Sequence, residues 1–454
     1  MLATSMRRLL GLMTLGLFLL TPLSARAADP QEDVVIQWNG ELIQIFRDKD
    51  AGWDPELAAY TAAITNIAIF DAVNASSGKY RPYIYSGPAL PGAQVDAAAA
   101  TAGHDALVGV LNRWLGKSSP SIYKRLKDSC DALLQKQLHA IPEGSGKKAG
   151  IKQGQLAAQA ILAARQADGS ERRQDVGYSP GRLPGDYELT PPANLPADKP
   201  AWGKVKLFAL ERLSQFPPPG PPALTSAEYT RNFNDVKTVG CLSCPARTSE
   251  QTLLAKFWAE QSPGTRTPPG SWIVIAQTLG VLQKNNLLQN ARMFALLSIA
   301  MADAGIVAWD VKYTYARWRP VTAIRMAQDD GNPATQPDPT WESLLPAPNF
   351  PAYFSGHSTF GSAASTALAE FFGTDKLTFT CTSDTVPGVT LTYHSLSKAA
   401  YDNGRARIWL GVHMENENVD AANVGTNIGR YVYTTQLTEA APAKNPEVSA
   451  TGQP

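Results

Sequence analysis

A proline-rich stretch in the middle of the chain limits the folds that are open to it. Residues 169–227 include LPGDYELTPPANLPADKP and FPPPGPPAL. Proline runs of this kind fit neither a regular helix nor a central strand. On both sides the sequence is rich in alanine and leucine at helical spacing. We therefore expect two helical halves that are joined by a long, ordered connecting segment.

Apolar residues recur with the period of a helix over most of the remaining chain. Asp54 can cap the first long helix, and Pro55 suits its first turn. The expected helices cover residues 52–76, 92–115, 119–140, 147–167, 248–261, 286–311, 395–405 and 417–434, and one more follows FSGHS at 354–358. Residues 380–393 read as a loop or a small hairpin. The predicted fold class is all-α.

The N-terminus predicts export. Arg7 and Arg8 precede the apolar stretch LLGLMTLGLFLLTPL, and Ala25-Arg26-Ala27 fits a cleavage site. We expect residues 1–27 to be a signal peptide and the mature protein to be periplasmic or secreted, although a retained anchor is an alternative. No later stretch reaches about 18 uncharged apolar residues, so stable membrane insertion is not expected.

The rest of the chain divides by composition. We expect an N-terminal helical region with the proline-rich connector at 28–225 and a C-terminal helical domain at 226–437. A tail at 438–454 is rich in Pro, Ala, Thr and Glu, and we expect it to be disordered. The formal net charge of +1 gives no general attraction to nucleic acid. The oligomeric state remains open.

The four cysteines suit an oxidising compartment. Cys241 and Cys244 lie close enough in CLSC for a local disulfide. No histidine or further cysteine stands nearby to complete a zinc site, so a structural disulfide is favoured over a redox motif. Cys130 and Cys381 are either paired or free.

Two segments of the second half combine cations with aromatic or apolar neighbours. WDVKYTYARWRP holds Lys312 and Arg319, which are seven residues apart and would share one face of a helix. ARIWLGVHMENE holds Arg407 and His413, which are six apart and fit a turn that feeds a helix beginning near Asn416. Arginine's forked guanidinium matches tetrahedral oxyanions well.

A third segment contains one of only five histidines in the chain. In FSGHS, Ser355 offers a hydroxyl, and Gly356 allows the backbone to approach a ligand closely. The following helix directs free N–H groups at whatever lies in front of it. His357 can transfer protons. Together with the cations, these residues predict an oxyanion site.

The three segments resemble the signature of the vanadium-dependent haloperoxidases and the type-2 phosphatidic acid and acid phosphatases. That signature is K-x6-RP, then PSGH, then SR-x5-H, and this chain carries KYTYARWRP, FSGH and ARIWLGVH in the same order. The resemblance is tight over residues 309–413. Phe354 replaces proline, Ala406 replaces serine, and Glu417 stands where the family often has aspartate. The resemblance implies a fold of two helical bundles packed as in the haloperoxidases, with long proline-rich loops.

The resemblance also implies roles. In a peroxidase the cofactor is vanadate, His413 is the vanadium ligand, His357 moves protons and Lys312 polarises peroxide. The residues implied to hold the oxyanion are Lys312, Arg319, Ser355, Gly356, Arg407 and His413. The substrates are hydrogen peroxide, a halide and an organic acceptor.

A phosphatase of the same superfamily is the alternative. It needs no cofactor: His413 attacks the phosphorus of a phosphate ester to form a phosphohistidine, and His357 protonates the leaving alcohol. Trp309 and Phe350 resemble the halide-side residues of chloroperoxidase-type enzymes, which favours the peroxidase, although they could be ordinary core aromatics. A site that merely binds an oxyanion is a third possibility, and the intact His357 argues against it.

Several further polar residues have less defined roles. Asp303, in the expected helix at 286–311, is either a counter-ion to the basic pocket or, in the more ordinary reading, a capped or solvent-facing carboxylate. His104 and His139 read as packing or surface groups. His394 precedes a helix and could line the mouth of the pocket.

Overall fold

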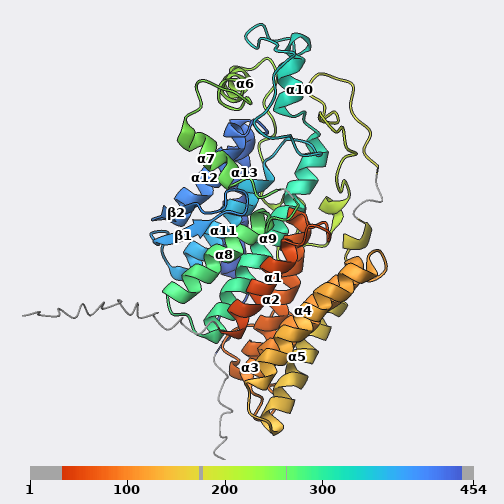
Figure 1. The fold of residues 1–454 in the computed structure, drawn as a ribbon, viewed down its shortest axis with the longest axis vertical. Coiled ribbons are helices and arrows are strands. Elements are labelled where there is room, and N and C mark those ends of the chain that lie inside the picture. Colours follow the sequence, from red (N-terminus) through yellow and green to blue (C-terminus); the bar gives the residue numbers. More distant parts are fainter. Residues whose placement is uncertain (1–32, 173–176, 262, 442–454) are drawn as a thin grey trace, which may run out of the picture.

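The computed structural model describes residues 33–172, 177–261 and 263–441 (Figure 1). The predicted signal peptide at 1–27 lies outside the described residues. The helices are α1 (Val34–Phe46), α2 (Pro55–Ser77), α3 (Val95–Leu115), α4 (Pro120–His139), α5 (Ser145–Ala164), α6 (Ala227–Val239), α7 (Ser249–Phe257), α8 (Thr267–Leu282), α9 (Leu287–Tyr315), α10 (Pro320–Arg325), α11 (Gly356–Phe372), α12 (Leu396–Trp409) and α13 (Glu415–Thr435). This confirms the all-α class.

One small hairpin interrupts the helices. Strands β1 (Phe379–Thr382) and β2 (Thr390–Tyr393) pair antiparallel, so that Cys381 lies opposite Leu391. The prediction of a loop or hairpin at 380–393 is therefore confirmed.

Local signals explain where the two longest core helices begin and end. The side chain of Asp54 accepts a hydrogen bond from Leu57 N at the start of α2, and the helix stops at Gly78, which has φ 60°. Asn286 and a glutamine three residues later form a capping box at the start of α9. By length and composition both helices could cross a membrane, but both are buried inside the protein.

The helices form two bundles that meet along α2 and α9. In the first half, α3 packs against α2, α4 and α5, and in the second α11 packs against α9, α12 and α13. Figure 1 shows the first bundle at one end, from red to yellow, and the second at the other, from green to blue. Because α2 packs against α9, residues of both bundles share one continuous core.

The proline-rich connector is ordered where it is described, with short turns at Trp202–Lys204 and Leu213–Gln215. Asp303 of α9 anchors it: the carboxylate accepts hydrogen bonds from the backbone N–H groups of Phe208 (2.6 Å), Ala209 (2.8 Å) and Leu210 (2.8 Å). Asp303 is therefore a capped carboxylate, as one reading of the sequence expects, and it is not solvent-facing, since it is fully buried and bonded to the connector's backbone.

The cysteines form one disulfide and two buried thiols in the described part of the chain. Cys241 and Cys244 form a disulfide, as predicted. Cys130 and Cys381, both in the described part of the chain, are free and buried. Backbone hydrogen bonds join residues 438–440 to residues 79–81, so the beginning of the predicted disordered tail is ordered, and residues 442–454 lie outside the described residues.

Candidate active site

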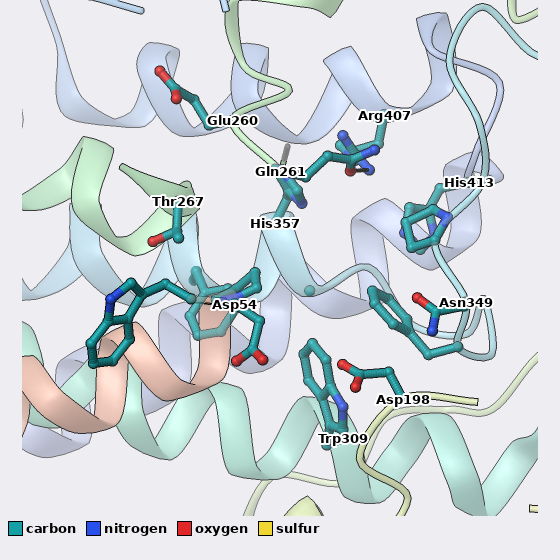
Figure 2. A pocket seen from close by; sticks show the side chains of 16 residues that line it. Asp54, Asp198, Glu260, Gln261, Thr267, Trp309, Asn349, His357, Arg407 and His413 are labelled. Carbon is teal, nitrogen blue, oxygen red and sulfur yellow. Dashed lines mark hydrogen bonds between the residues drawn. The ribbon is translucent and has the colours of Figure 1, made fainter. Parts of the chain in front are cut away.

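A cavity of about 200 Å³ lies where the two bundles meet (Figure 2). Six of the predicted site residues line it: Trp309, Phe350, Gly356, His357, Arg407 and His413. Their positions span more than 100 residues of sequence, yet they surround one space. The structure also buries three further predicted residues next to the residues that line the cavity: Lys312, Arg319 and Ser355.

Lys312 and Arg319 do not share a helix face, and that prediction is wrong. Helix α9 ends at Tyr315, and Ala316 follows in the left-handed region with φ 44°. Arg319 precedes Pro320, and a residue before proline is disfavoured in helical geometry. It accordingly adopts an extended conformation (φ −82°, ψ 156°) as the cap of α10.

Lys312 supports the loop in front of FSGHS. Its Nζ donates to the carbonyl oxygens of Pro351 (3.0 Å), Ala352 (3.2 Å) and Phe354 (2.7 Å). An ammonium has three hydrogens, so these contacts occupy all of them. Burial, followed by repulsion from Arg319, holds the pKa of Lys312 well below its usual value. The carbonyl of Phe354, which replaces the family's proline, is thus part of this support.

Arg319 connects the loop to the second histidine. Its Nε donates to the carbonyl of Phe350 (2.9 Å), and Nη1 donates to the carbonyl of Val412 (2.8 Å) and lies 3.1 Å from Nε2 of His413. Its Nη2 is buried without a hydrogen-bond partner among the described residues. Burial lowers the pKa of Arg319 to about 10, so it remains charged at neutral pH.

Arg407 is the donor least satisfied by the protein itself. It lies in the last turn of α12, which runs four residues beyond its expected end. Nη2 donates to Oε1 of Gln261 (2.5 Å), whereas Nε and Nη1 are buried and have no partner within the described chain. Burial, and then repulsion from Arg319, lowers the pKa of Arg407 to about 9. Burying a donor without an acceptor costs free energy, and a bound anion would supply the missing acceptors.

Ser355 and Gly356 begin α11 as predicted. Ser355 is the cap, and its side chain accepts from the backbone N–H of Ser358. The hydroxyl oxygens of Ser355 and Ser358 lie 2.9 Å apart. Gly356 is the first residue of the helix, where backbone N–H groups lack partners within the helix. Because Gly356 lines the cavity, the N-terminus of α11 faces the cavity, where it would stabilise a bound anion.

His413 has a defined tautomer. Nη1 of Arg319 is a donor and lies 3.1 Å from Nε2, which must therefore accept; Nδ1 lies 2.6 Å from Oε2 of Glu417, a carboxyl whose pKa burial raises to about 7. The proton therefore sits on Nδ1, and Nε2 keeps its lone pair. Burial, and then the charge of Arg319, holds the pKa of His413 well below its usual value. The family's aspartate is thus replaced here by a glutamate that still reaches the ring.

His357 has the opposite tautomer. Its Nε2 lies 2.9 Å from the carbonyl oxygen of Ala259, so Nε2 carries the proton and Nδ1 is the basic atom. Burial, and then the charge of Arg407, holds the pKa of His357 well below its usual value. Both cavity histidines are therefore neutral at pH 7 when no anion is bound.

Two aromatic rings close one side of the cavity. The ring centroids of Trp309 and Phe350 lie 5.0 Å apart, and Lys312 Nζ lies 5.0 Å from the Phe350 centroid. The predicted halide-side pair thus forms one wall, beside the buried cations. His394, for which a place at the pocket mouth is only the alternative reading, is exposed in the hairpin region and lies 3.1 Å from Thr378; it is not among the described residues that line the cavity.

Sequence reasoning missed the contribution of more distant segments. Gln261 and the Ala259 carbonyl orient Arg407 and His357, and the stretch FWAEQSPGTRTPPGSW that holds them carried only a loose family resemblance. Asp54 was recognised only as a helix cap, and Asp198 carried no signal, yet both line the cavity. Their role depends on how the first bundle and the connector fold against the second.

Comparisons with known proteins agree with this arrangement. Residues 292–440 match a family model described as the VCPO second helical-bundle domain. A curated vanadium chloroperoxidase of Curvularia inaequalis is 33% identical over 243 residues, which cover 43% of this chain and 39% of that protein. The chain thus matches about two fifths of the length of that relative.

Solved structures extend the likeness to nearly the whole fold. A bacterial vanadium-dependent iodoperoxidase is 25% identical with a TM-score of 0.73, and the match covers 89% of this chain and 97% of that one. A bacterial vanadium-dependent chloroperoxidase is 20% identical with a TM-score of 0.63 over 84% of this chain and 91% of that one, which shows the fold alone. With its two bundles and its three motifs around one cavity, this chain is similar over most of its length to the vanadium-dependent haloperoxidases, and residues 292–440 match the second helical-bundle domain of that family.

Proposed function

We propose that this protein is an exported, vanadate-dependent haloperoxidase that oxidises a halide with hydrogen peroxide. One observation carries the proposal: Arg319, next to the unprotonated Nε2 of His413, and Arg407, which lines the same cavity, hold buried donors with no partner among the described residues. This donor set is complementary to a tetrahedral oxyanion that also accepts a nitrogen ligand. The names of the relatives, a chloroperoxidase and an iodoperoxidase, favour the peroxidase branch.

The residues present fit vanadate. His413 Nε2 would be the ligand, while Arg319, Arg407 and the Gly356 N–H would hold oxygens. The chemistry that vanadate supplies when bound is Lewis-acid activation of hydrogen peroxide. Lys312 contributes positive charge from behind the loop, and its Nζ reaches an oxyanion directly only by exchanging one of its three carbonyl contacts.

The histidines divide the remaining work. His357 accepts a proton at Nδ1, because its Nε2–H is held by the Ala259 carbonyl. In this role His357 would accept a proton from peroxide at Nδ1 and later donate it, as a general acid–base group. Trp309 and Phe350 exclude water from one wall and leave an apolar approach for a weakly hydrated halide.

The same geometry keeps the phosphatase as a second candidate. A lone pair on His413 Nε2, with the ring held by Glu417, also suits attack on phosphorus. In that case no cofactor is needed, and the arginines stabilise the charge of the transferring phosphoryl group.

Activity with and without orthovanadate separates the candidates. Halogenation of a phenol dye that needs both vanadate and peroxide is the expected result. Hydrolysis of 4-nitrophenyl phosphate that vanadate inhibits would support the phosphatase instead. Vanadate retention with neither activity would leave an oxyanion-binding protein and overturn the proposal.

The ligand role of His413 and the export of the chain are tested separately. The variant His413→Ala should lose retained vanadium, as measured by metal analysis after gel filtration, and full retention would remove the assigned role. For export, N-terminal sequencing of the protein from a periplasmic or culture fraction should begin after Ala27. An intact N-terminus in the cytoplasmic fraction would contradict the periplasmic or secreted location.

A further inference from the structure

The cavity has an acidic opening, which we call the mouth and which holds Asp54 and Asp198, and a basic inner wall, which we call the floor and which holds Arg407 and His413. Asp54, at the start of α2, and Asp198, in the connector, both line the cavity, with side chains 22% and 21% exposed. In Figure 2 these two residues lie on the side opposite Arg407 and His413. The two carboxylates therefore meet a ligand before the buried cations do.

One ammonium holds this acidic mouth together. Nζ of Lys199 pairs with Asp54, lies 2.7 Å from Oδ2 of Asp198, and lies 3.3 Å from Oε1 of Glu56. Lys199 and Glu56 are buried beneath the two aspartates. Burial raises the pKa of Glu56 well above its usual value. Burial also raises the pKa of Asp54, and the cluster places three carboxyl groups around the Lys199 ammonium.

The mouth is also held rigidly against the site. The backbone N–H of Asp198 donates to the carbonyl of Asn349 (2.9 Å), and Asn349 Nδ2 donates to the carbonyl of Pro196 (2.8 Å). The next residue, Phe350, accepts a hydrogen bond from Nε of Arg319. The acidic mouth and the basic floor are thus joined through one loop, which gives them a fixed separation.

Two aromatic rings accompany the carboxylates. Trp53, which precedes Asp54, and Trp309 both line the cavity. Carboxylates combined with aromatic faces are the usual surroundings of a bound ammonium group. Independently, Nε and Nη1 of Arg407, a residue only 1% exposed, have no partner within the described chain, which indicates that the same cavity is built for a ligand.

We propose that Asp54 and Asp198 bind the positively charged group of an organic substrate, a primary or substituted ammonium, whose reactive part points toward the floor. The inference rests on the proposed function, because this substrate is the acceptor of the oxidised halogen. Halide, peroxide and a proton give hypohalous acid and water. The acid then replaces an aromatic hydrogen by halogen and releases a second water. The cavity volume of about 200 Å³ suits an acceptor with one ring, since drug-sized ligands need roughly 300 Å³ or more.

Three phenols of similar size but different charge test the proposal: tyramine (positive), tyrosol (neutral) and 3-(4-hydroxyphenyl)propionate (negative). Their dissociation constants are measured by calorimetry or ligand-observed NMR on the full-length protein with orthovanadate, so the readout does not need turnover. Tyramine should bind about fivefold more tightly than tyrosol at low salt, as one partly exposed ion pair allows, and the propionate should bind most weakly. The preference should shrink in 0.5 M salt.

Two variants keep the shape of the mouth and remove its charge. Asp198→Asn and Asp54→Asn should each reduce the ratio of tyramine to tyrosol affinity toward one, and asparagine at 54 can still cap α2. Asp128→Asn makes the same change of net charge on α4, outside the cavity lining, and should preserve the ratio. Thermal melts identify any variant that fails to fold.

The outcomes separate this subsite from the proposed function. Equal affinities for the three phenols, or a ratio that neither aspartate variant changes, would overturn the subsite. A charge preference in binding without any halogenation would keep the subsite and reject the peroxidase. Halogenation of all three phenols at equal rates, with equal affinities, would keep the peroxidase and reject the subsite, because the oxidised halogen would then act away from the mouth.

Discussion

Glu417 sets the protonation of His413. Its Oε2 lies 2.6 Å from the ring Nδ1 and also accepts the backbone N–H of Met414 at 3.2 Å. Because the carboxylate accepts the Nδ1 proton, Nε2 is left with its lone pair on the side of the cavity. This contact at the start of α13, together with the donor Nη1 of Arg319 at 3.1 Å from Nε2, leaves His413 able to act as a ligand or a nucleophile.

Replacing this carboxylate by an amide should misdirect the ring. In Glu417→Gln the amide can donate to Nδ1 and so favour the tautomer with the proton on Nε2. We expect vanadate affinity to fall about 10- to 100-fold, the range for the loss of a residue that orients a metal ligand. Equilibrium dialysis with metal analysis measures it. Glu417→Asp, which restores the family's residue, should retain more affinity than the amide, and equal losses would contradict the tautomer argument.

The affinity for the oxyanion should depend on the forked guanidinium of Arg407 as well as on its positive charge. Arg407→Lys keeps a cation but removes the planar donors, of which two have no partner among the residues described. We expect vanadate or phosphate to bind about tenfold or more weakly, since a hydrogen bond to a charged group contributes about 1.5–3 kcal/mol. The neighbouring Arg405→Lys is a matched control, because Arg405 pairs with Asp235 and Glu415. Similar losses in both variants would argue against a specific role.

His357 should be needed for turnover more than for binding. In His357→Ala the cations and His413 remain, so the variant should retain the oxyanion. Turnover should fall about 10²- to 10⁴-fold, the usual contribution of a positioned acid–base group. Parallel measurement of vanadium content and of the rate separates the two effects. Normal turnover over a range of pH would exclude the proton-transfer role.

Asp303 should matter for stability and leave the oxyanion affinity unchanged. Asp303→Asn weakens three hydrogen bonds that hold residues 208–210, and its amide places an N–H against a backbone N–H. We expect a loss of about 2–3 kcal/mol in the free energy of unfolding, measured in urea. The exposed Asp128→Asn should change it by less than about 1 kcal/mol. A large drop in oxyanion affinity for folded Asp303→Asn would restore the counter-ion reading.

His104 should give a pH-dependent contribution to stability. Its Nδ1 lies 2.7 Å from Asp105 and its Nε2 lies 2.8 Å from Asp131. Burial lowers the pKa of His104, but the hydrogen bonds to the two carboxylates outweigh burial, so the folded pKa is raised. The stabilisation is therefore complete below the unfolded pKa of about 6.5 and is lost as the pH rises through the folded value.

The corresponding measurement is the free energy of unfolding of His104→Asn across pH. It should be about 1 kcal/mol below that of the parent protein near pH 5.5, and the difference should shrink by pH 9. His139→Asn, at the exposed end of α4, is the comparison variant. A difference that grows with pH would reverse the assigned sign.

Local sequence predicted nine of the described helices, because their signals are local, but it missed α1, α6, α8 and α10. Asp54 and Pro55 begin α2, and Ser355 caps α11, through contacts within three residues. The error at Arg319 has a local cause too. The spacing of seven from Lys312 suggested one helix face, but Pro320 excludes Arg319 from a helix, and Ala316 turns the chain back toward the loop.

The sequence by itself determined the helical class, the three motifs and the chemical character of an oxyanion site, since residue type and spacing carry that information. Only the tertiary structure decided how the donors are used: Lys312 gives its three hydrogens to loop carbonyls, whereas two donor groups of Arg407 have no partner in the described part of the chain. It also brought Asp54 and Asp198 to the mouth of a cavity whose floor is built more than 100 residues later. The physical reason is burial: a charge excluded from water takes its partners from whatever segment packs against it, and that choice is set by long-range packing.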